Sequence, residues 1–356
     1  MSKVGIIGAT GYVGIELLRL LLTHPLVTVE AISSSSFKGE EIASIYKILI
    51  NKINLICENP ENVIEKCDVI FTALPHGLSE KFALKALERK KKIIDLGADF
   101  RLDSEKDYQQ WYGKNFINSD LHKLSVYGLP ELNRKKIKNC SIIANPGCYP
   151  TSIALALMPL LKNSLIKTNN IIIDSKSGAT GAGRGLSLKS HYAELNENFA
   201  PYKIGSHRHT PEIEQTLSSI AGESVEVTFT PHLLPINRGI LSTIYCETKN
   251  NLSLKSIHQI YDEFYKNEKF LQVLPLNTTA EIKNVKYSNN CQISLHENYQ
   301  KNKLIIISTI DNMIKGAAGQ AIQNLNLILG LNEDCGLNMI SPPFKFLRRL
   351  LKLKLI

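Results

Sequence analysis

Residues 3–22 restrict the fold more than any other part of the chain. They read KVGIIGATGYVGIELLRLLL, which is a short β-branched run, a glycine turn and an amphipathic helix in succession. Strand and helix patterns then alternate through roughly residue 147, in VTVEAI, CDVIFTALP, SEKFALKALERK and KKIIDLGADF. This alternation predicts parallel βαβ units, and therefore an α/β domain on a parallel sheet.

The glycine turn directly follows the first strand and opens the first helix. Glycines at such a turn let the backbone approach a pyrophosphate, which the helix N-terminus then holds. The spacing is GxxGxxG rather than GxGxxG, so a ligand-free turn between strand and helix is the alternative. The residues expected to bind a dinucleotide are Gly8, Thr10, Gly11, Tyr12, Val13 and Gly14.

The end of the second strand indicates which dinucleotide is used. It carries four serines, 33–36, followed by Lys38, and no Asp or Glu occurs before Glu40. A carboxylate at this position would bind the ribose 2′-OH of NAD, whereas hydroxyls and a cation suit the extra phosphate of NADP. We therefore expect Ser33 and Ser35 to contact NADP, with a plain polar loop as the alternative.

The pattern changes after residue 148. NIIIDSKSG, VEVTFTPHLLP, ILSTIYCETK, AEIKNVKYSNNCQISLHE and KLIIISTID read as strands, with one helix near 253–267. Strands with few helices between them predict an antiparallel or mixed sheet in a second, α+β domain. The last helix, MIKGAAGQAIQNLNLILGL, is expected to pack back on the first domain. The predicted domains are 1–147 with 313–344, and 148–312, followed by a basic tail, 345–356.

Cys148 lies in NPGCYPT, residues 145–151, just before the apolar stretch IALALMPLL. Pro150 is pre-set for the first position of a helix, so Cys148 is expected at a helix N-terminus. Free N–H groups and the helix dipole stabilise a thiolate at such a place, and the thiolate is the nucleophile. The alternative is a buried turn cysteine without chemistry.

The segment GSHRHTPE, residues 205–212, offers a general base. His207 and His209 are two apart, so in an extended segment both face the same side, and Glu212 can orient an imidazole. A metal site needs further ligands, and none is evident at a suitable spacing. The alternative is a solvated polar loop.

SGATGAGR, residues 177–184, is a second glycine-rich loop that predicts either an anion-binding nest or a hairpin connection.

Composition excludes several classes of function. The chain has 356 residues and a net charge of +9, but cations in the last twelve residues supply +5, which leaves +4 for the rest. This mild excess suits an anionic small molecule, and no nucleic-acid motif accompanies it. The seven cysteines are scattered without a CxxC pair, which argues against disulfides and zinc. With no signal peptide and no apolar run of membrane length, we expect a cytoplasmic protein without a membrane partner.

Taken together, these motifs resemble the N-acetyl-gamma-glutamyl-phosphate reductase family. The resemblance spans nearly the whole chain, and its motifs occur in the family's order: GATGYVG, ALPHG (73–77), LGADFR (96–101), YGLPE (127–131), NPGCYPT, SGATGAGR, GSHRHTPE, TFTPHLLPINRGI (228–240) and DNMIKGAAGQAIQN (311–324). It implies a Rossmann domain completed by the last helix, plus a catalytic α+β domain of the glyceraldehyde-3-phosphate dehydrogenase type. It also implies NADPH-dependent reduction of N-acetyl-γ-glutamyl phosphate in arginine biosynthesis.

The same resemblance implies residue roles. Cys148 would be the nucleophile that forms a thioester, and His209 the acid–base group whose ring Glu212 fixes. The residues implied to contact the cofactor are Pro75, Ser177, Gly178 and Asn312. Those implied to contact the substrate are Arg101, Asn145, Arg184, His207 and Arg208. No metal is implied, and a homo-oligomer, either a dimer or a tetramer, is expected.

Two features depart from the family pattern. Thr180 stands where serine is more usual, which keeps the hydroxyl, and the tail KFLRRLLKLKLI extends beyond the usual end. The tail alternates leucines with cations, so it is either a frayed extension, which we favour, or an amphipathic helix for a membrane surface or partner.

Other activities remain as alternatives. An aspartate-semialdehyde dehydrogenase would need a carboxylate for the substrate ammonium, and an N-acetylaminoadipyl phosphate reductase is separated poorly by sequence. A Cys–His acyltransferase would not need the glycine turn. A non-catalytic NADP-sensing binder would not need Cys148 and His209.

Overall fold

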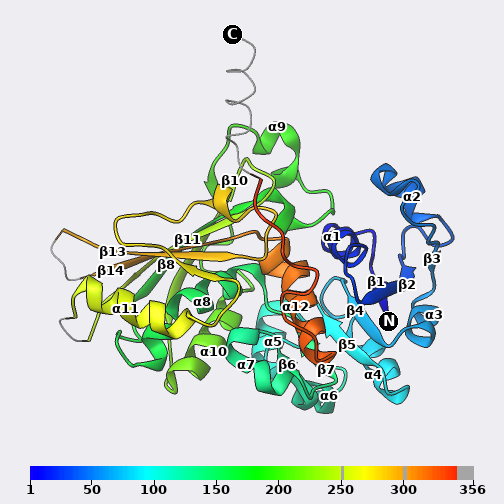
Figure 1. Cartoon of the computed structure of the whole chain (residues 1–356), viewed down its shortest axis with the longest axis horizontal. Coiled ribbons are helices and arrows are strands. Elements are labelled where there is room, and N and C mark those ends of the chain that lie inside the picture. The colour runs from blue at the N-terminus through cyan, green and yellow to red at the C-terminus, as the bar shows by residue number, and fades with distance from the viewer. Residues whose placement is uncertain (250–251, 300–302, 343–356) are drawn as a thin grey trace, which may run out of the picture.

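The computed structural model describes residues 1–249, 252–299 and 303–342. Two seven-stranded sheets form its framework, and helices pack on both (Figure 1). The predicted tail at 345–356 lies outside the described residues.

The first sheet is entirely parallel, as the alternation of strands and helices predicted. Its strand order is β3-β2-β1-β4-β5-β7-β6, so β1 lies between β2 and β4 and the order reverses there. Ligands of open α/β sheets bind at such a reversal, beyond the carboxyl ends of the strands. The strands are β1 (Ser2–Ile7), β2 (Val27–Ser33), β3 (Cys57–Glu58), β4 (Val69–Thr72), β5 (Lys92–Asp95), β6 (Ser125–Tyr127) and β7 (Ile142–Ala144).

Helices connect these strands. The first, α1, follows the glycine turn, as predicted, and α4 corresponds to the predicted helix SEKFALKALERK. The helices of this part are α1 (Tyr12–Leu21), α2 (Ile42–Ile45), α3 (Pro60–Lys66), α4 (Glu80–Glu88), α5 (Glu105–Tyr112), α6 (Ser119–Leu124) and α7 (Pro130–Ile137), with a 3₁₀ turn, η1 (Lys47–Leu49).

The second sheet is mixed, as expected. Its order is β12-β13-β14-β11-β8-β10-β9, in which β8 and β10 pair in parallel, as do β12 and β13, and the remaining neighbours are antiparallel. The strands are β8 (Ile171–Gly178), β9 (Ala200–Pro201), β10 (Val227–Leu234), β11 (Ile240–Cys246), β12 (Leu271–Val273), β13 (Cys291–Glu297) and β14 (Leu304–Ile310). Only the end of the predicted strand at 280–297 is β13; a 3₁₀ turn, η4 (Ile282–Asn284), precedes it.

The helix that begins at the candidate nucleophile is the centre of the second core. Every residue of α8 (Cys148–Lys162) from Tyr149 to Leu161 is buried, and the helix packs on β11, β14 and α10 (Thr210–Ala221). A helix that is apolar all round is stable only when it is buried in this way.

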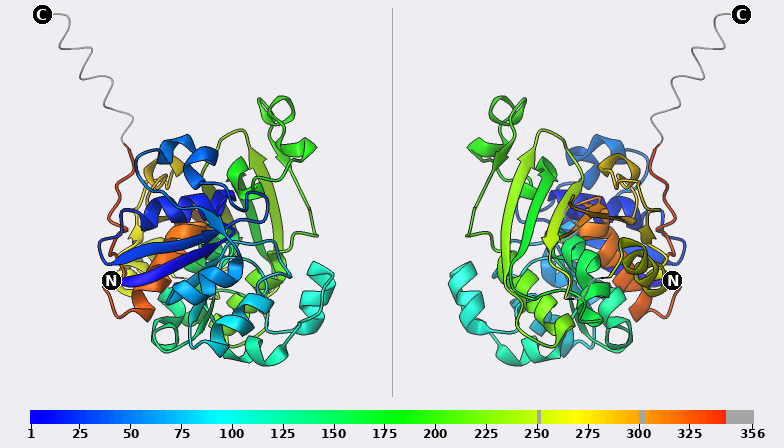
Figure 2. Two further views of the ribbon diagram at one scale, coloured as in Figure 1. Left: turned by 90° about the vertical axis from the view of Figure 1, so that its right-hand side faces the viewer. Right: turned by 90° about the vertical axis from the view of Figure 1, so that its left-hand side faces the viewer.

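The sequence reading missed α10. Its buried Ile213, Leu217 and Ile220 have helical spacing, but the polar residues of TPEIEQTLSSIA obscured it. The predicted helix near 253–267 is α11 (Leu254–Tyr265). A short helix, α9 (Tyr192–Leu195), follows the 3₁₀ turn η3 (Leu188–Ser190), and both lie on an arm that projects from the second sheet (Figure 2).

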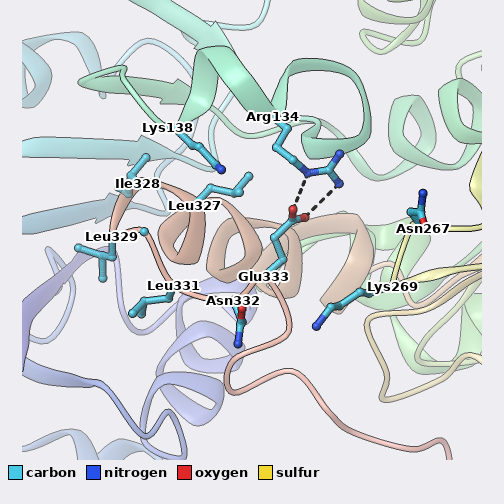
Figure 3. A pocket seen from close by; sticks show the side chains of 11 residues that line it. Arg134, Lys138, Asn267, Lys269, Leu327, Ile328, Leu329, Leu331, Asn332 and Glu333 are labelled. Carbon is cyan, nitrogen blue, oxygen red and sulfur yellow. Dashed lines mark hydrogen bonds and ion pairs between the residues drawn. The ribbon is translucent and has the colours of Figure 1, made fainter.

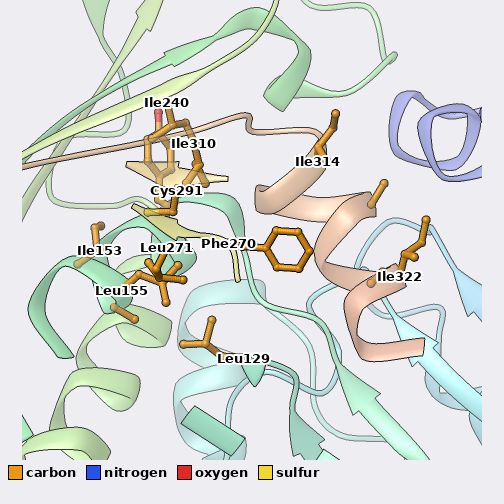
Figure 4. Packing of buried hydrophobic residues seen from close by; sticks show 14 of the residues in the cluster. Leu129, Ile153, Leu155, Ile240, Phe270, Leu271, Cys291, Ile310, Ile314 and Ile322 are labelled. Atoms are coloured by element: carbon orange, nitrogen blue, oxygen red, sulfur yellow. The ribbon is translucent and has the colours of Figure 1, made fainter. Parts of the chain in front are cut away.

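The predicted final helix is two elements rather than one. A π-helical turn, η5 (Ile314–Ala318), precedes α12 (Gly319–Ile328). The latter packs against α1, α7 and β5 of the first sheet. One apolar core joins the two sheets at this point, where Phe270 lies beside Ile314 and Ile322 (Figure 4). Within the described residues, no helix is long and apolar enough to cross a membrane.

Candidate active site

The nucleophile candidate is the first residue of α8. Gly147 is the N-cap, with extended backbone, and Thr151 donates a hydrogen bond from its hydroxyl to the Gly147 carbonyl at 2.9 Å. The helix therefore begins two residues earlier than the sequence reading placed it, and Pro150 is its third residue. Proline is tolerated there because the first N–H groups of a helix have no partner within it.

The electrostatics of Cys148 differ from the expected stabilised thiolate. Burial raises the pKa of the Cys148 thiol to about 11, while Arg101 and the backbone N–H of Tyr149 act in the opposite direction. Since desolvation disfavours the charged form, the resting group is a neutral thiol. The helix N-terminus alone does not ionise it, so a base must accept its proton.

His209 is the candidate for this base. Burial, and after it the charges of Arg101, Arg208 and Lys203, lower the pKa of His209 far below its ordinary value. Its Nε2 lies against Gly147, because a Cβ placed on that glycine would be 2.7 Å from the nitrogen. The imidazole is therefore neutral and beside the residue that precedes Cys148.

His207 supports the loop rather than the proton transfer. Its Nδ1 accepts the backbone N–H of His209 at 3.1 Å, and burial lowers the pKa of His207 to about 2. The ring centroids of His207 and His209 lie 4.9 Å apart. This agrees with the expectation that both side chains face the same side. The segment is a turn that ends at the N-cap of α10, not an extended strand.

Glu212 does not orient the His209 ring, contrary to the prediction. Its carboxylate accepts the Gly147 N–H at 2.8 Å and the Tyr127 hydroxyl at 2.9 Å, and pairs with Arg101 at 3.3 Å. The His209 Nδ1 is buried without a hydrogen-bond partner among the described residues. The carboxylate is fully buried and fixes the loop that carries Cys148.

Arg101 and Asn145 lie behind the nucleophile. Arg101 donates to the carbonyls of Asn145 and Leu96, both at 2.9 Å, as well as to Glu212, so most of its donors are used within the protein. The Asn145 side chain donates to the Ala317 carbonyl and accepts from Asn324. Asn145 thus has a scaffolding position directly behind the lining and is not itself one of the lining residues, which argues against the predicted substrate contact.

A cavity of about 580 Å³ opens beside Cys148. Its lining includes Arg101, Lys203 and Arg208, and no described residue of the lining is an aspartate or a glutamate. Three cations in the lining, of which Arg101 is paired with the buried Glu212 behind it, favour an anionic ligand. The lining residues are Leu74, Pro75, His76, Leu96, Gly97, Ala98, Arg101, Tyr112, Cys148, Tyr149, Ser177, Gly178, Gly181, Ala182, Ser187, Ser190, Tyr202, Lys203, His207, Arg208, His209 and Leu233.

Sequence reasoning missed several residues of this cavity. His76 hydrogen-bonds the Arg208 guanidinium, with Nη1 2.9 Å from Nδ1, and Arg208 stacks over the Tyr112 ring at 5.4 Å. Lys203 and Tyr202 also line the cavity and come from the segment that directly follows β9. The ALPHG motif contained the signal for His76, but nothing in the sequence brings it next to Arg208.

The π-helical turn packs directly on the nucleophile. A Cβ on Gly316 would lie 2.8 Å from the Cys148 Cβ and 3.3 Å from the Asp311 carbonyl oxygen. The turn is held by the buried Lys315, whose Nζ lies 2.7 Å from both Glu131 Oε1 and Gln323 Oε1. Only glycine at 316 allows the turn to approach Cys148 this closely.

We expect Gly316→Ala to lower kcat by about 10²-fold, because a displacement of the nucleophile by about 1 Å has this order of effect. Cofactor affinity, measured by fluorescence titration, is expected to change little. Gly185→Ala is the matched control, since a Cβ there meets no atom within 4 Å. Normal kcat in Gly316→Ala would show that Cys148 tolerates the shift.

The glycine turn fits a dinucleotide. Gly8 has a φ of +94°, and a Cβ on Gly14 would lie 2.2 Å from the Gly8 carbonyl oxygen, so side chains are excluded at both. A Cβ on Gly11, the N-cap of α1, would meet the Gly8 carbonyl oxygen at an ordinary contact distance of 3.7 Å, and no side chain of the described residues caps the helix. The first N–H groups of α1 are therefore available for a pyrophosphate. The first turn of α1 includes the predicted Tyr12 and Val13.

The predicted 2′-phosphate residues separate into a buried and an exposed one. Ser33 is 2% exposed, and its carbonyl accepts the N–H groups of Gly8 and Ala9. Ser35 is exposed at the end of β2. The Ser34 hydroxyl bonds that of Thr10 at 2.7 Å. The structure thus makes Ser33 a support for the glycine turn, which corrects its expected role as a phosphate ligand.

Residues 177–184, the second glycine-rich loop, contact two different parts of the site. Ser177 and Gly178 line the cavity, as does Pro75. Asn312 lies behind them: it accepts the Gly239 N–H at 2.7 Å and donates to the Thr180 hydroxyl at 3.0 Å. A nicotinamide contact for Asn312 stays a prediction.

Arg184 is not near Cys148. It donates to the Thr10 carbonyl of the glycine turn at 3.0 Å and does not line the cavity beside Cys148, which argues against its predicted contact with the substrate.

A second cavity, of about 590 Å³, lies at the C-terminal end of α12 (Figure 3). Its Arg134 is paired with Glu333 and Glu268, and the lining contains no nucleophile–base pair. Among the described residues, no group of His, Cys, Asp and Glu could hold a metal ion. The candidate catalytic groups therefore lie in the cavity beside Cys148.

Comparisons with known proteins agree on a family. The semialdehyde dehydrogenase NAD-binding domain matches residues 3–140, and the semialdehyde dehydrogenase dimerisation domain matches residues 148–312. The N-acetyl-gamma-glutamyl-phosphate reductase of Clostridium beijerinckii is 69% identical over 344 residues, which cover 97% of this chain and 100% of that protein. That of Brachyspira hyodysenteriae is 56% identical over 352 residues, with the same shares covered.

Solved structures show the same fold. Aspartate semialdehyde dehydrogenase II of Vibrio cholerae, complexed with ASA, has a TM-score of 0.71 at 18% identity and covers 93% of this chain and 98% of that chain. The Candida albicans enzyme with NADP has a TM-score of 0.69 at 17% identity, with 93% and 99% covered.

Proposed function

The chain belongs to the N-acetyl-gamma-glutamyl-phosphate reductase family, and from this premise we propose how its cavity performs that reaction. The enzyme reduces N-acetyl-γ-glutamyl phosphate to N-acetylglutamate 5-semialdehyde and phosphate, a step of arginine biosynthesis. The observation that carries the proposal is that the neutral Cys148 and the neutral His209 line one cavity, together with three cations.

In the first half of the reaction, Cys148 forms a thioester. The His209 imidazole accepts the thiol proton as sulfur attacks the acyl carbon, and the proton passes to the departing phosphate. A neutral base and a neutral thiol suit each other here, because each group already has the protonation state that the transfer requires. Thiolate is both a good nucleophile and a good leaving group, which the second half needs.

In the second half, the thioester becomes an aldehyde. A reduced nicotinamide cofactor, held by the glycine turn and by the loop that carries Pro75, would supply a hydride to the thioester carbon. His209, which takes up a proton from water after the phosphate has left, then delivers it to the oxygen as the oxygen gains charge. Collapse of the thiohemiacetal releases the aldehyde and restores the Cys148 thiol.

The cations divide between binding and support. Arg208 and Lys203 bind the phosphate and the α-carboxylate of the substrate, because they line the cavity and come from the loops over Cys148. Arg101, whose donors are mostly committed, holds the loop at Asn145 and adds positive potential beside Cys148.

A parallel assay tests the substrate. Phosphate-dependent reduction of NADP is measured with N-acetylglutamate semialdehyde, aspartate semialdehyde and the N-acetylated aminoadipate analogue. We expect a clear preference for N-acetylglutamate semialdehyde. Preference for the aspartate compound would overturn the proposal, and equal use of the aminoadipate analogue would widen the substrate class.

The nicotinamide cofactor is NADP rather than NAD in this proposal. Exposed Ser35, Ser36 and Lys38 at the end of β2 offer hydroxyls and a positive charge, and no carboxylate precedes Glu40. A site of this composition favours a 2′-phosphate over a bare ribose.

We expect Ser35→Asp to reduce the ratio of kcat/KM for NADPH to that for NADH by about tenfold to a hundredfold, by repulsion of the 2′-phosphate. Ser35 is preferred to Ser33 for this test because a carboxylate at the buried Ser33 would also disturb the glycine turn. Ser35→Ala is the control, with a small effect. An unchanged ratio in Ser35→Asp would place the 2′-phosphate elsewhere.

A homo-oligomer, either a dimer or a tetramer, completes the proposal. One face of the second sheet packs on α8, while the opposite face presents half-buried Tyr245 and Ile305, paired across β11 and β14, and Ile172 at 37% exposure. Apolar side chains in register on an open face suit a second copy. Light scattering of Tyr245→Lys tests this, with a shift to monomer expected; a variant of unchanged mass would refute it.

We further propose that the chain acts in the cytoplasm and that its cofactor domain comprises 1–147 with 313–344. The seven cysteines are free, which suits a reducing compartment. The packing of α12 on α1 and α7 supports the assignment of the last helix to the cofactor domain.

A further inference from the structure

Arg184 reaches from the second glycine-rich loop to the cofactor turn. Its Nη1 donates to the Thr10 carbonyl at 3.0 Å and to the Tyr46 hydroxyl at 3.1 Å. The guanidinium carbon lies 5.4 Å from the centre of the Phe37 ring and 5.3 Å from that of Tyr46. Tyr46 itself donates to the same Thr10 carbonyl at 2.8 Å. Four contacts thus fix one exposed arginine over the end of β2.

The contacts use only one edge of the guanidinium. An arginine has five N–H donors, and the two on Nη1 are occupied by Thr10 and Tyr46. Nε and Nη2 carry the other three, and they make no hydrogen bond to any described residue. This second edge has the two-pronged geometry that binds phosphate through paired hydrogen bonds.

The neighbours of this edge match a phosphate on a ribose. Phe37, on which Arg184 stacks, lies between Ser36 and Lys38, and all of these follow directly after β2. The Thr10 hydroxyl bonds that of Ser34, so the glycine turn and the serine run meet at the same place. In dinucleotide-binding sheets, the end of the second strand is where the adenosine ribose lies.

We propose that Arg184 is a specificity-determining residue that the second domain supplies to the 2′-phosphate of NADP. Its free edge binds the phosphate, while Phe37, Tyr46 and the Thr10 carbonyl hold the guanidinium in place. The inference rests on the proposed function, since it assumes a nicotinamide dinucleotide on the glycine turn.

This arrangement gives the serine run a partner that the sequence alone did not provide. Hydroxyls and one exposed lysine are weak determinants by themselves, because Lys38 is a flexible point charge. An arginine held between two rings is pre-organised, so little conformational freedom is lost when phosphate binds. Because Arg184 follows β8, the second domain takes part in cofactor choice.

Binding of adenosine fragments tests the inference without turnover. Calorimetry compares 2′,5′-ADP with 5′-AMP on the full chain and on Arg184→Gln. We expect the variant to bind 2′,5′-ADP about 10- to 100-fold more weakly, with a much smaller change for 5′-AMP. Arg184→Lys keeps the charge but loses the paired donors, so we expect an intermediate loss.

Lys52→Gln is the matched control. It removes one exposed cation from the segment just beyond Tyr46, where Lys52 makes no ion pair among the described residues. We expect both fragments to bind Lys52→Gln as they bind the unmodified protein. A loss as large as that in Arg184→Gln would show that long-range charge, rather than the guanidinium contact, sets the affinity.

Three other results would count against the inference. Equal weakening of 2′,5′-ADP and 5′-AMP in Arg184→Gln would make Arg184 a general support of the turn, and unchanged 2′,5′-ADP affinity would remove it from the site. Arg184→Lys with full affinity would refute the two-nitrogen contact. These results are independent of the assay with the three semialdehydes, which tests the proposed function itself.

Discussion

Cys148→Ser is expected to lower turnover to less than about one part in 10⁴, because the hydroxyl is a much weaker nucleophile and a poorer leaving group than the thiol. The environment of Cys148 sharpens this expectation. Burial already raises the pKa of its thiol to about 11, and a hydroxyl, which is intrinsically a weaker acid, would stay protonated there even with His209 beside it. Steady-state reduction of the acyl phosphate measures the loss.

Binding separates chemistry from folding in this variant. We expect NADPH to bind Cys148→Ser nearly as it binds the unmodified protein, since the glycine turn lies apart from Cys148. Cys335→Ser, at a partly exposed cysteine that does not line the cavity, is the control and is expected to keep full activity. Substantial reductase activity in Cys148→Ser would remove this residue from the mechanism.

The sequence predicted the parts of this molecule that local patterns encode. The strand, glycine turn and helix at the N-terminus form a contiguous unit, so hydrophobic spacing and three glycines were sufficient to predict a parallel α/β domain. Cys148 at a helix start was likewise predictable, because NPGCYPT contains its own turn and helix signals. Both features need no information about distant residues.

The partners of Glu212 could not be predicted in this way. Its proximity to His209 in sequence suggested a contact with that ring, whereas the folded chain brings Gly147, Tyr127 and Arg101 to its carboxylate. The partners of a buried charge depend on which segments meet in the core. The sequence alone favours the partner that is nearest along the chain. Here that partner was His209, and the prediction was wrong.

The protonation state of Cys148 was mispredicted for a related reason. A helix N-terminus favours a thiolate, but burial disfavours it, and the size of the second effect depends on the surrounding fold. Arg184 illustrates the same limit, since its loop lies far in sequence from Thr10, Phe37 and Tyr46. Only the fold brings it to the glycine turn.

His209→Asn is expected to lower kcat/KM by about 10²–10⁴-fold at neutral pH, the range typical of a general acid–base group. Asparagine keeps a polar side chain of similar size but cannot accept and return a proton. His191→Asn is the matched control, because His191 is exposed and outside the cavity lining. A loss below tenfold in His209→Asn would assign the proton transfer to another group.

The pH dependence of this variant distinguishes the loss of a base from a change in the shape of the cavity. The pKa of His209 lies far below its ordinary value and that of Cys148 near 11, so the neutral pair exists throughout the range between them. The unmodified enzyme therefore has a flat activity profile near neutrality, and its activity is lost as the pH falls through the lowered pKa of His209.

Without His209, only preformed thiolate reacts, and the rate of Cys148 alkylation by iodoacetamide is expected to rise about tenfold per pH unit toward the pKa of the thiol. A flat alkylation profile in His209→Asn, parallel to that of the unmodified protein, would mean that His209 does not take the thiol proton and serves only to shape the cavity.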